Sequence, residues 1–220
     1  MLQGILFDMD GVLVDNLEIH KQAFGIFFER YGMHKSAEEL SRVFGMGNDD
    51  IMRAVMPHDI IESVGLRELG YEKEAIYREL YAPTIKPVAG LTDLLSACES
   101  AGVKCAVGSS GCTDNVNFVL DSCDLRRYFS ATVAGDKVSK CKPDPEIYLT
   151  AAAAIGADPS HCVVFEDAEA GIEAGKRAGM KVIALSTTFD ADFLEATQAD
   201  MIISDFTQID IARINELLSH

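Results

Sequence analysis

Short apolar runs rich in β-branched residues recur along the chain, and segments with helical periodicity separate them. The predicted strands are Gly4–Phe7, Val103–Gly108, Cys162–Phe165, Lys181–Leu185 and Met201–Ser204, with a weaker one at Ala131–Ala134. Helices are predicted at Gly90–Ala101, Asp114–Cys123, Pro145–Ile155 and Ala168–Gly179. This alternation is typical of βαβ units, so it predicts an α/β protein with a Rossmann-like parallel sheet.

One long stretch, from Asn16 to Pro83, interrupts the alternation. It contains no convincing strand, and helical periodicity recurs at Leu17–Phe28, Glu38–Met46, Asp49–Met56, Asp59–Leu69 and Glu72–Tyr81. A crossover between parallel strands needs only about a dozen residues, so this stretch is too long to be a simple connection. We therefore predict an inserted all-helical cap over residues 16–83 and one α/β core formed by residues 1–15 and 84–220.

Polar residues follow four of the predicted strands. They are Asp8 and Asp10, then Ser109 and Ser110, then Lys142, and finally Glu166 and Asp167. In an open parallel sheet, ligands bind beyond the carboxyl ends of the strands, so we expect these side chains to meet at one edge. Carboxylates suit Mg²⁺, while hydroxyls, free N–H groups and an ammonium suit phosphate. The set predicts a site for a phosphate and a magnesium ion.

The spacing of Asp8 and Asp10 indicates that the two carboxylates can act on the same substrate. Side chains at positions i and i+2 of an extended strand project to the same side, so both carboxylates can face one substrate. Gly11 then permits a tight turn. One carboxylate can attack phosphorus while the other exchanges a proton with the leaving oxygen, as phosphoryl transfer through a covalent intermediate requires.

The charge balance excludes several classes of partner. Asp and Glu number 35 against 19 Lys and Arg, which gives a net charge of −16 and a sequence pI near 4.6. Such a chain repels phosphate backbones and anionic lipid, so we expect neither nucleic-acid nor membrane binding. A small anionic substrate is still compatible if a divalent cation acts locally.

The remaining sequence features indicate a cytoplasmic protein. No run is long and apolar enough to span a bilayer, and the first residues lack the pattern of a signal peptide. The six cysteines show no zinc-ligand spacing, so we expect reduced thiols. We expect a monomer or weak homodimer whose partner is a small phosphorylated metabolite.

Four motifs in order along the chain resemble the signatures of the haloacid dehalogenase (HAD) superfamily. The first runs from Phe7 to Asp15 and includes Asp8-Met9-Asp10-Gly11, and the second is Gly108-Ser109-Ser110-Gly111. The third is Lys142-Pro143-Asp144-Pro145, and the fourth begins with Phe165-Glu166-Asp167. The helical insert resembles the C1-type cap of the β-phosphoglucomutase-like branch.

The resemblance implies a role for each motif residue. Asp8 would be the nucleophile that forms an aspartyl-phosphate, and Asp10 would protonate the leaving group and then activate water. Asp8, Asp167 and the Asp10 carbonyl would bind Mg²⁺, with Glu166 as a further ligand or as a partner acting through water. Ser109 and the Ser110 N–H would hold the phosphoryl group, and Lys142 would neutralise it.

Two enzymatic functions and one non-enzymatic function are compatible with the sequence of the cap and the core. His20 and Lys73 lie at spacings that resemble the mutase pattern, but Asn48 stands where the mutase places an arginine for the second phosphate. We therefore predict a phosphatase acting on a small metabolite such as a sugar phosphate, with β-phosphoglucomutase as the alternative. Arg53, one turn further on, could replace the missing arginine. A phospho-aspartate receiver module is the third reading, and the second acid, Asp10, argues against it.

Overall fold

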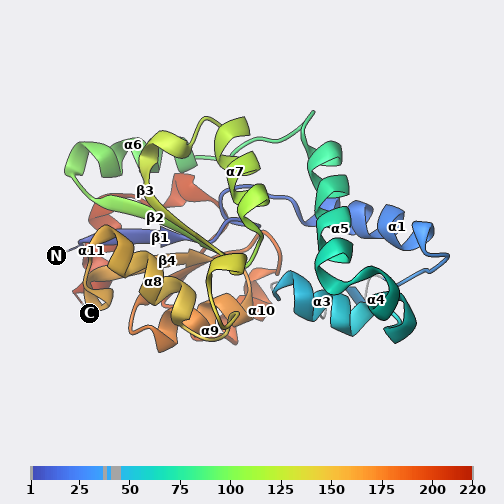
Figure 1. Ribbon diagram of the computed structural model, residues 1–220. Helices are drawn as coiled ribbons and strands as arrows, with labels where there is room; N and C mark the ends of the chain where they lie inside the picture. Colours follow the sequence, from blue (N-terminus) through green and yellow to red (C-terminus); the bar gives the residue numbers. More distant parts are fainter. Residues whose placement is uncertain (1, 37–38, 41–45, 220) are drawn as a thin grey trace.

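The chain folds around a six-stranded, fully parallel sheet with the strand order β3-β2-β1-β4-β5-β6 (Figure 1). The computed structural model describes residues 2–36, 39–40 and 46–219. The strands are β1 (Gly4–Phe7), β2 (Lys104–Ser109), β3 (Phe129–Ala134), β4 (Cys162–Glu166), β5 (Lys181–Leu185) and β6 (Met201–Ile203). All six predicted strands are present, so the predicted Rossmann-like α/β fold is confirmed.

Helices cover both faces of the sheet because the side chains of its central strand alternate between two apolar clusters. Ile5 and Phe7 of β1 pack into one cluster, and Leu6 packs into the other. The helices on the first face are α6 (Leu91–Ala101), α7 (Thr113–Ser122) and α11 (Ile211–Leu218). Those on the second face are α8 (Glu146–Ile155), α9 (Glu169–Arg177) and α10 (Ala191–Glu195).

The segment between β1 and α6 is helical and lies beyond the carboxyl ends of the strands (Figure 1). Its described helices are α1 (Leu17–Arg30), α3 (Asn48–Val55), α4 (His58–Val64) and α5 (Leu66–Tyr81). The helix predicted at Asp59–Leu69 is wrong in its bounds, because Gly65 adopts φ +100° and separates α4 from α5. Most of the helix predicted at Glu38–Met46 lies outside the described residues. No helix in the described part of the chain combines the length and apolarity needed to cross a membrane.

A partly buried carboxylate, that of Asp200, links α9 and β5 to the segment that precedes β6. Asp200 accepts hydrogen bonds from Lys176 Nζ at 2.6 Å, Lys181 Nζ at 3.2 Å and the Val182 N–H at 2.8 Å. Burial would raise the pKa of Asp200, but these donors outweigh it and lower the pKa below its usual value. The ionised carboxylate therefore stabilises the folded state.

We expect Asp200→Asn to reduce the free energy of unfolding by about 1–2 kcal/mol at pH 7, because it removes charge-assisted hydrogen bonds. The depressed folded pKa makes this contribution complete above the unfolded pKa of about 4, and it is lost as the pH falls through the folded value. Urea unfolding of both proteins at pH 7 and at decreasing pH checks this. The difference between them is expected to shrink in acid, and a constant difference would contradict the assignment.

Candidate active site

The loop after β1 brings the first two acidic residues to the edge of the sheet. The Asp8 N–H donates to the Phe165 carbonyl at 3.0 Å, so the first turn of this loop stays attached to β4. Gly11 follows with φ +75°, and a Cβ atom there would overlap the Asp167 carboxylate. Glycine at position 11 therefore lets the two acidic loops approach each other closely.

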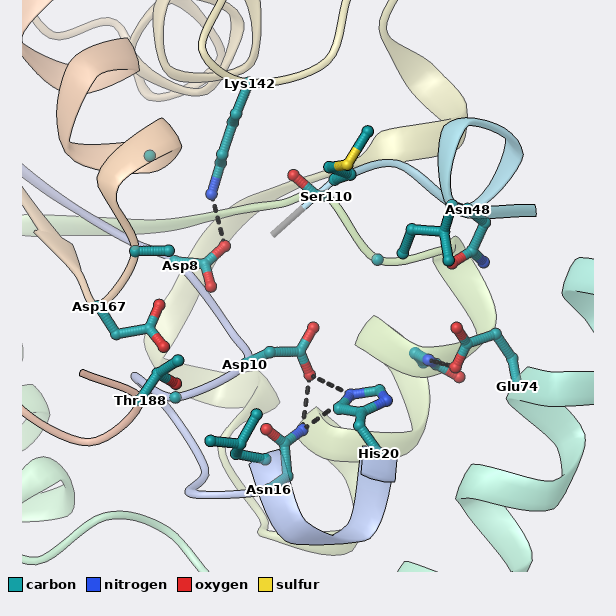
Figure 2. A pocket seen from close by; sticks show the side chains of 18 of the residues that line it. Asp8, Asp10, Asn16, His20, Asn48, Glu74, Ser110, Lys142, Asp167 and Thr188 are labelled. Carbon is teal, nitrogen blue, oxygen red and sulfur yellow. Dashed lines mark hydrogen bonds and ion pairs between the residues drawn. The ribbon is translucent and has the colours of Figure 1, made fainter. Parts of the chain in front are cut away.

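Lys142 bridges two of the buried carboxylates. Its Nζ lies 2.6 Å from Asp8 Oδ1 and 2.6 Å from Glu166 Oε1, and all three side chains are buried (Figure 2 shows the pair with Asp8). Asp167 lies beside Asp8 in the same view. The carboxyl ends of β1 and β4 and the loop before α8 thus bring together the acids and the lysine that the sequence predicts for one site.

Glu166 has no free acceptor position in this arrangement. One of its oxygens accepts from Lys142 and from the Tyr148 hydroxyl, each at 2.6 Å. The other accepts from the N–H groups of Asp167 at 2.9 Å and Ala168 at 3.2 Å. A carboxylate has about four lone-pair sites, and here all are used. Two roles were predicted for Glu166, a direct metal ligand or a partner acting through water, and the full set of hydrogen bonds favours the second.

The acid cluster fits a divalent cation. Oxygens of Asp8, Glu166 and Asp167 lie within 4.8 Å of one another. Burial, opposed by Lys142 and reinforced by the charges of Glu166 and Asp10, raises the pKa of Asp8 to about 8. Burial, then Glu166 and Asp8, raise the pKa of Asp167 as well. The single positive charge of Lys142 does not balance the negative charges of three buried acids. A Mg²⁺ ion would supply the missing positive charge, and it is commonly bound by a few carboxylate oxygens.

Asp10 lies in a different environment from Asp8. Its Oδ1 accepts from Asn16 Nδ2 at 2.6 Å and lies 3.4 Å from His20 Nε2 (Figure 2). Burial would raise the pKa of Asp10, but the hydrogen bonds from His20 and Asn16 outweigh it and lower that pKa. Asp10 is therefore held as a carboxylate beside Asp8 but outside the lysine cluster.

The tautomer of His20 follows from its second neighbour. Lys73 Nζ lies 2.8 Å from His20 Nδ1, and an ammonium group can only donate. His20 Nδ1 must therefore accept, which leaves the proton on Nε2, facing Asp10. The ring also stacks on Tyr77 at 4.1 Å between centroids, which fixes its plane. His20 and Lys73 were both predicted from the sequence as cap residues of the site. His20 contacts Asp10 directly, and Lys73 contacts the far nitrogen of the His20 ring.

The two serines after β2 differ in what their hydroxyls do. Ser109 Oγ is buried and accepts from the Gly111 N–H at 3.0 Å, and Ser109 is not among the residues that line the pocket. Ser110 lines the pocket, and its buried Oγ has no hydrogen-bond partner within the described structure. The hydroxyl poised for an incoming ligand is thus that of Ser110, whereas the sequence had suggested only the Ser110 N–H and the Ser109 side chain.

The wall opposite Asp8 comes from the helical segment. Asn48, at the start of α3, faces the pocket together with Glu74 of α5 (Figure 2). Asn115 of α7 also lines the pocket and donates to Glu74 at 2.6 Å. Arg53 lines an adjoining cavity, which shares Asn48 and Ser110 with this pocket. Sequence reasoning missed Asn16, Glu74 and Asn115, whose positions become meaningful only once the insert is packed against the core.

Comparison with known proteins shows which family and which relatives the chain resembles. The family described as haloacid dehalogenase-like hydrolase matches residues 5–185. Validoxylamine A 7′-phosphate phosphatase of Streptomyces hygroscopicus subsp. limoneus is 32% identical over 95% of this chain and 96% of its own. Phosphorylated carbohydrates phosphatase of Thermotoga maritima is 33% identical over 83% and 84%. The structure of CbbY from Rhodobacter sphaeroides in complex with phosphate has a TM-score of 0.86 and 25% identity, covering 98% of this chain and 100% of its own.

Proposed function

This chain belongs to the haloacid dehalogenase-like hydrolase family, and we propose that it is a Mg²⁺-dependent phosphatase of a small phosphorylated metabolite, of the sugar phosphate class. It is a phosphoric monoester hydrolase, in line with its relatives that are named as phosphatases. The observation that carries the proposal is the pairing of two carboxylates in unlike environments. Asp8 lies in the acid cluster that Lys142 bridges. Asp10 lies outside that cluster and contacts His20.

In the proposed reaction, Asp8 attacks phosphorus and forms an aspartyl-phosphate. The Asp8 oxygen that does not accept from Lys142 is free to act as the nucleophile. A phosphate bound beside Asp10 favours uptake of a proton there, which Asp10 gives to the leaving oxygen. Asp10, again a carboxylate, then removes a proton from the water that hydrolyses the acyl phosphate. His20 holds the Asp10 carboxylate in place during this step.

Asp8 and Asp167 would hold the magnesium ion, since Glu166 has no lone pair to offer. When bound between them, the ion would supply positive charge to offset that of the phosphoryl group. The residues around it have separate tasks. Lys142 binds a phosphate oxygen, and the Ser110 hydroxyl and the N–H groups of its loop donate to the others. The helical cap closes over the leaving group and selects it.

Dependence on the metal gives the direct test of this proposal. After dialysis against EDTA, we expect hydrolysis of p-nitrophenyl phosphate to fall by a factor of about 10³ or more, because the acid cluster would then repel the substrate. Added Mg²⁺ should restore the rate. Release of p-nitrophenolate is followed by absorbance. Full activity in EDTA would contradict the assignment of the acid cluster.

The cap wall supports the phosphatase over the mutase alternative. A mutase must hold a bisphosphate in two orientations, and Asn48 offers no charge for the second phosphate. Arg53, which the sequence suggested as a replacement, does not line this pocket but lines the adjoining cavity that shares Asn48 and Ser110 with it. The receiver-module alternative is excluded as the chain's class, because the chain is a phosphoric monoester hydrolase.

The unpartnered hydroxyl of Ser110 leads to a specific prediction. A buried hydroxyl without a partner costs stability, and a phosphate oxygen would satisfy it. We expect Ser110→Ala to raise KM for p-nitrophenyl phosphate by about 10- to 100-fold, the scale of one hydrogen bond to a charged group. Steady-state kinetics check this. Circular dichroism confirms the fold, and an unchanged kcat/KM would show that the hydroxyl binds no phosphate.

A further inference from the structure

An ion pair is buried in the cap wall of the pocket, opposite Asp8. Lys73 and Glu74 are each only 2% exposed, and Lys73 Nζ lies 2.9 Å from Glu74 Oε1. The other oxygen of Glu74 accepts from Asn115 Nδ2 at 2.6 Å. Burial would raise the pKa of Glu74, but Lys73 outweighs it and lowers that pKa. Glu74 is therefore a fixed negative charge inside the pocket.

Among the described residues that line the pocket, this pair leaves the cap side without an unpaired positive charge. Among the described residues that line the pocket, the only Lys or Arg side chains are Lys73 and Lys142. Lys142 is bound to Asp8 and Glu166 at the phosphoryl end. Lys73 donates to Glu74 and to His20, and it also lies over the Phe24 ring at 4.5 Å. Neither cation is available to a second anionic group.

We propose that Glu74 determines specificity by selecting monophosphate esters with an uncharged, hydroxyl-rich leaving group and by disfavouring bisphosphates. Because the Glu74 carboxylate neutralises Lys73, a second phosphate at the cap side finds no unpaired cation among the described residues that line the pocket. Hydroxyl groups of a polyol or sugar can instead donate to Glu74 and pair with the amides of Asn48 and Asn115. This inference rests on the proposed phosphatase function and adds the class of leaving group.

The test compares D-mannitol 1-phosphate with D-mannitol 1,6-bisphosphate, whose two phosphates are equivalent by symmetry. Each is measured as a competitor of p-nitrophenyl phosphate hydrolysis, so the inhibition constant is obtained whether or not the competitor is itself turned over. For the wild type we expect the monophosphate to bind about tenfold more tightly or better, the scale of one charge acting over several ångströms in a partly polar site.

The decisive variant is Glu74→Gln, which keeps the size of the side chain and an oxygen that can accept from Asn115. It frees the charge of Lys73, so we expect the ratio of the two inhibition constants to move about tenfold towards the bisphosphate. Glu79→Gln, an exposed position on the same helix, makes the same change in net charge and should leave the ratio unchanged.

The possible outcomes separate this inference from the proposed function. A wild-type ratio near one, or a ratio that Glu74→Gln does not change, overturns the role of Glu74. A purely structural role would weaken both competitors equally and so would also leave the ratio unchanged. Failure of the wild type to hydrolyse p-nitrophenyl phosphate with Mg²⁺ present would overturn the proposed function itself.

Discussion

Asp8→Asn is expected to reduce kcat for p-nitrophenyl phosphate by a factor of about 10⁴ or more, on the scale seen when a catalytic nucleophile is removed. An amide oxygen is a poor nucleophile towards phosphorus. The other carboxylate that Lys142 contacts, Glu166, already accepts four hydrogen bonds. Steady-state kinetics with Mg²⁺ present measure the loss.

The fold should survive this substitution. Asp8 is one of three buried acids in contact range, so removing its charge relieves repulsion. We expect the midpoint of urea unfolding in EDTA to be no lower than for the wild type. Asp93→Asn, an exposed change on α6, is the matched control and should keep full activity. Turnover of the Asp8 variant within tenfold of wild type would show that another group attacks phosphorus.

Asp10→Asn should separate the two chemical steps. General acid and base catalysis contributes about 10²–10⁴ in rate, and kcat is expected to fall by that factor. p-Nitrophenolate is a weak base that leaves without a proton, so formation of the phosphoenzyme should continue while its hydrolysis stalls. Rapid mixing is expected to show a burst of one p-nitrophenolate per active site, followed by slow release.

A substrate with an alkyl leaving group provides the contrast. An alkoxide needs a proton from Asp10, so Asp10→Asn should show no burst with an alkyl phosphate. His20→Gln serves as a second variant. It loosens Asp10 without removing its carboxylate, so its effect on kcat should be smaller. A linear time course at the wild-type rate with either substrate would contradict the role of Asp10.

The sequence predicted the core of the site because its residues follow strands. Asp8, Lys142, Glu166 and Asp167 come after apolar runs that had to become neighbouring parallel strands or lie close to their ends. The sheet order then brings them together without any further information. β1 is buried along its whole length, so a short continuous apolar run in the sequence was sufficient to place it.

The cap wall could not be predicted in the same way. The bond between Asn115 and Glu74 joins the core to the insert across 41 positions, and neither residue lies in a periodic pattern that marks it. The choice between the hydroxyls of Ser109 and Ser110 depends on which of them accepts from Gly111, a detail of loop geometry. The break at Gly65 depends on a positive φ angle that a glycine permits but does not require. The cytoplasmic location and the monomeric or weakly dimeric state stay predictions.

The covalent intermediate on Asp8 is the central claim, and chemical trapping tests it most directly. Protein mixed with Mg²⁺ and p-nitrophenyl phosphate is quenched within milliseconds and reduced with borohydride, which converts an aspartyl-phosphate to homoserine. Peptide mass mapping should find homoserine at position 8 only, in the wild type and to a larger extent in Asp10→Asn. Turnover without homoserine at that position, or with the modification at another carboxylate, would contradict the assignment of Asp8 as the nucleophile.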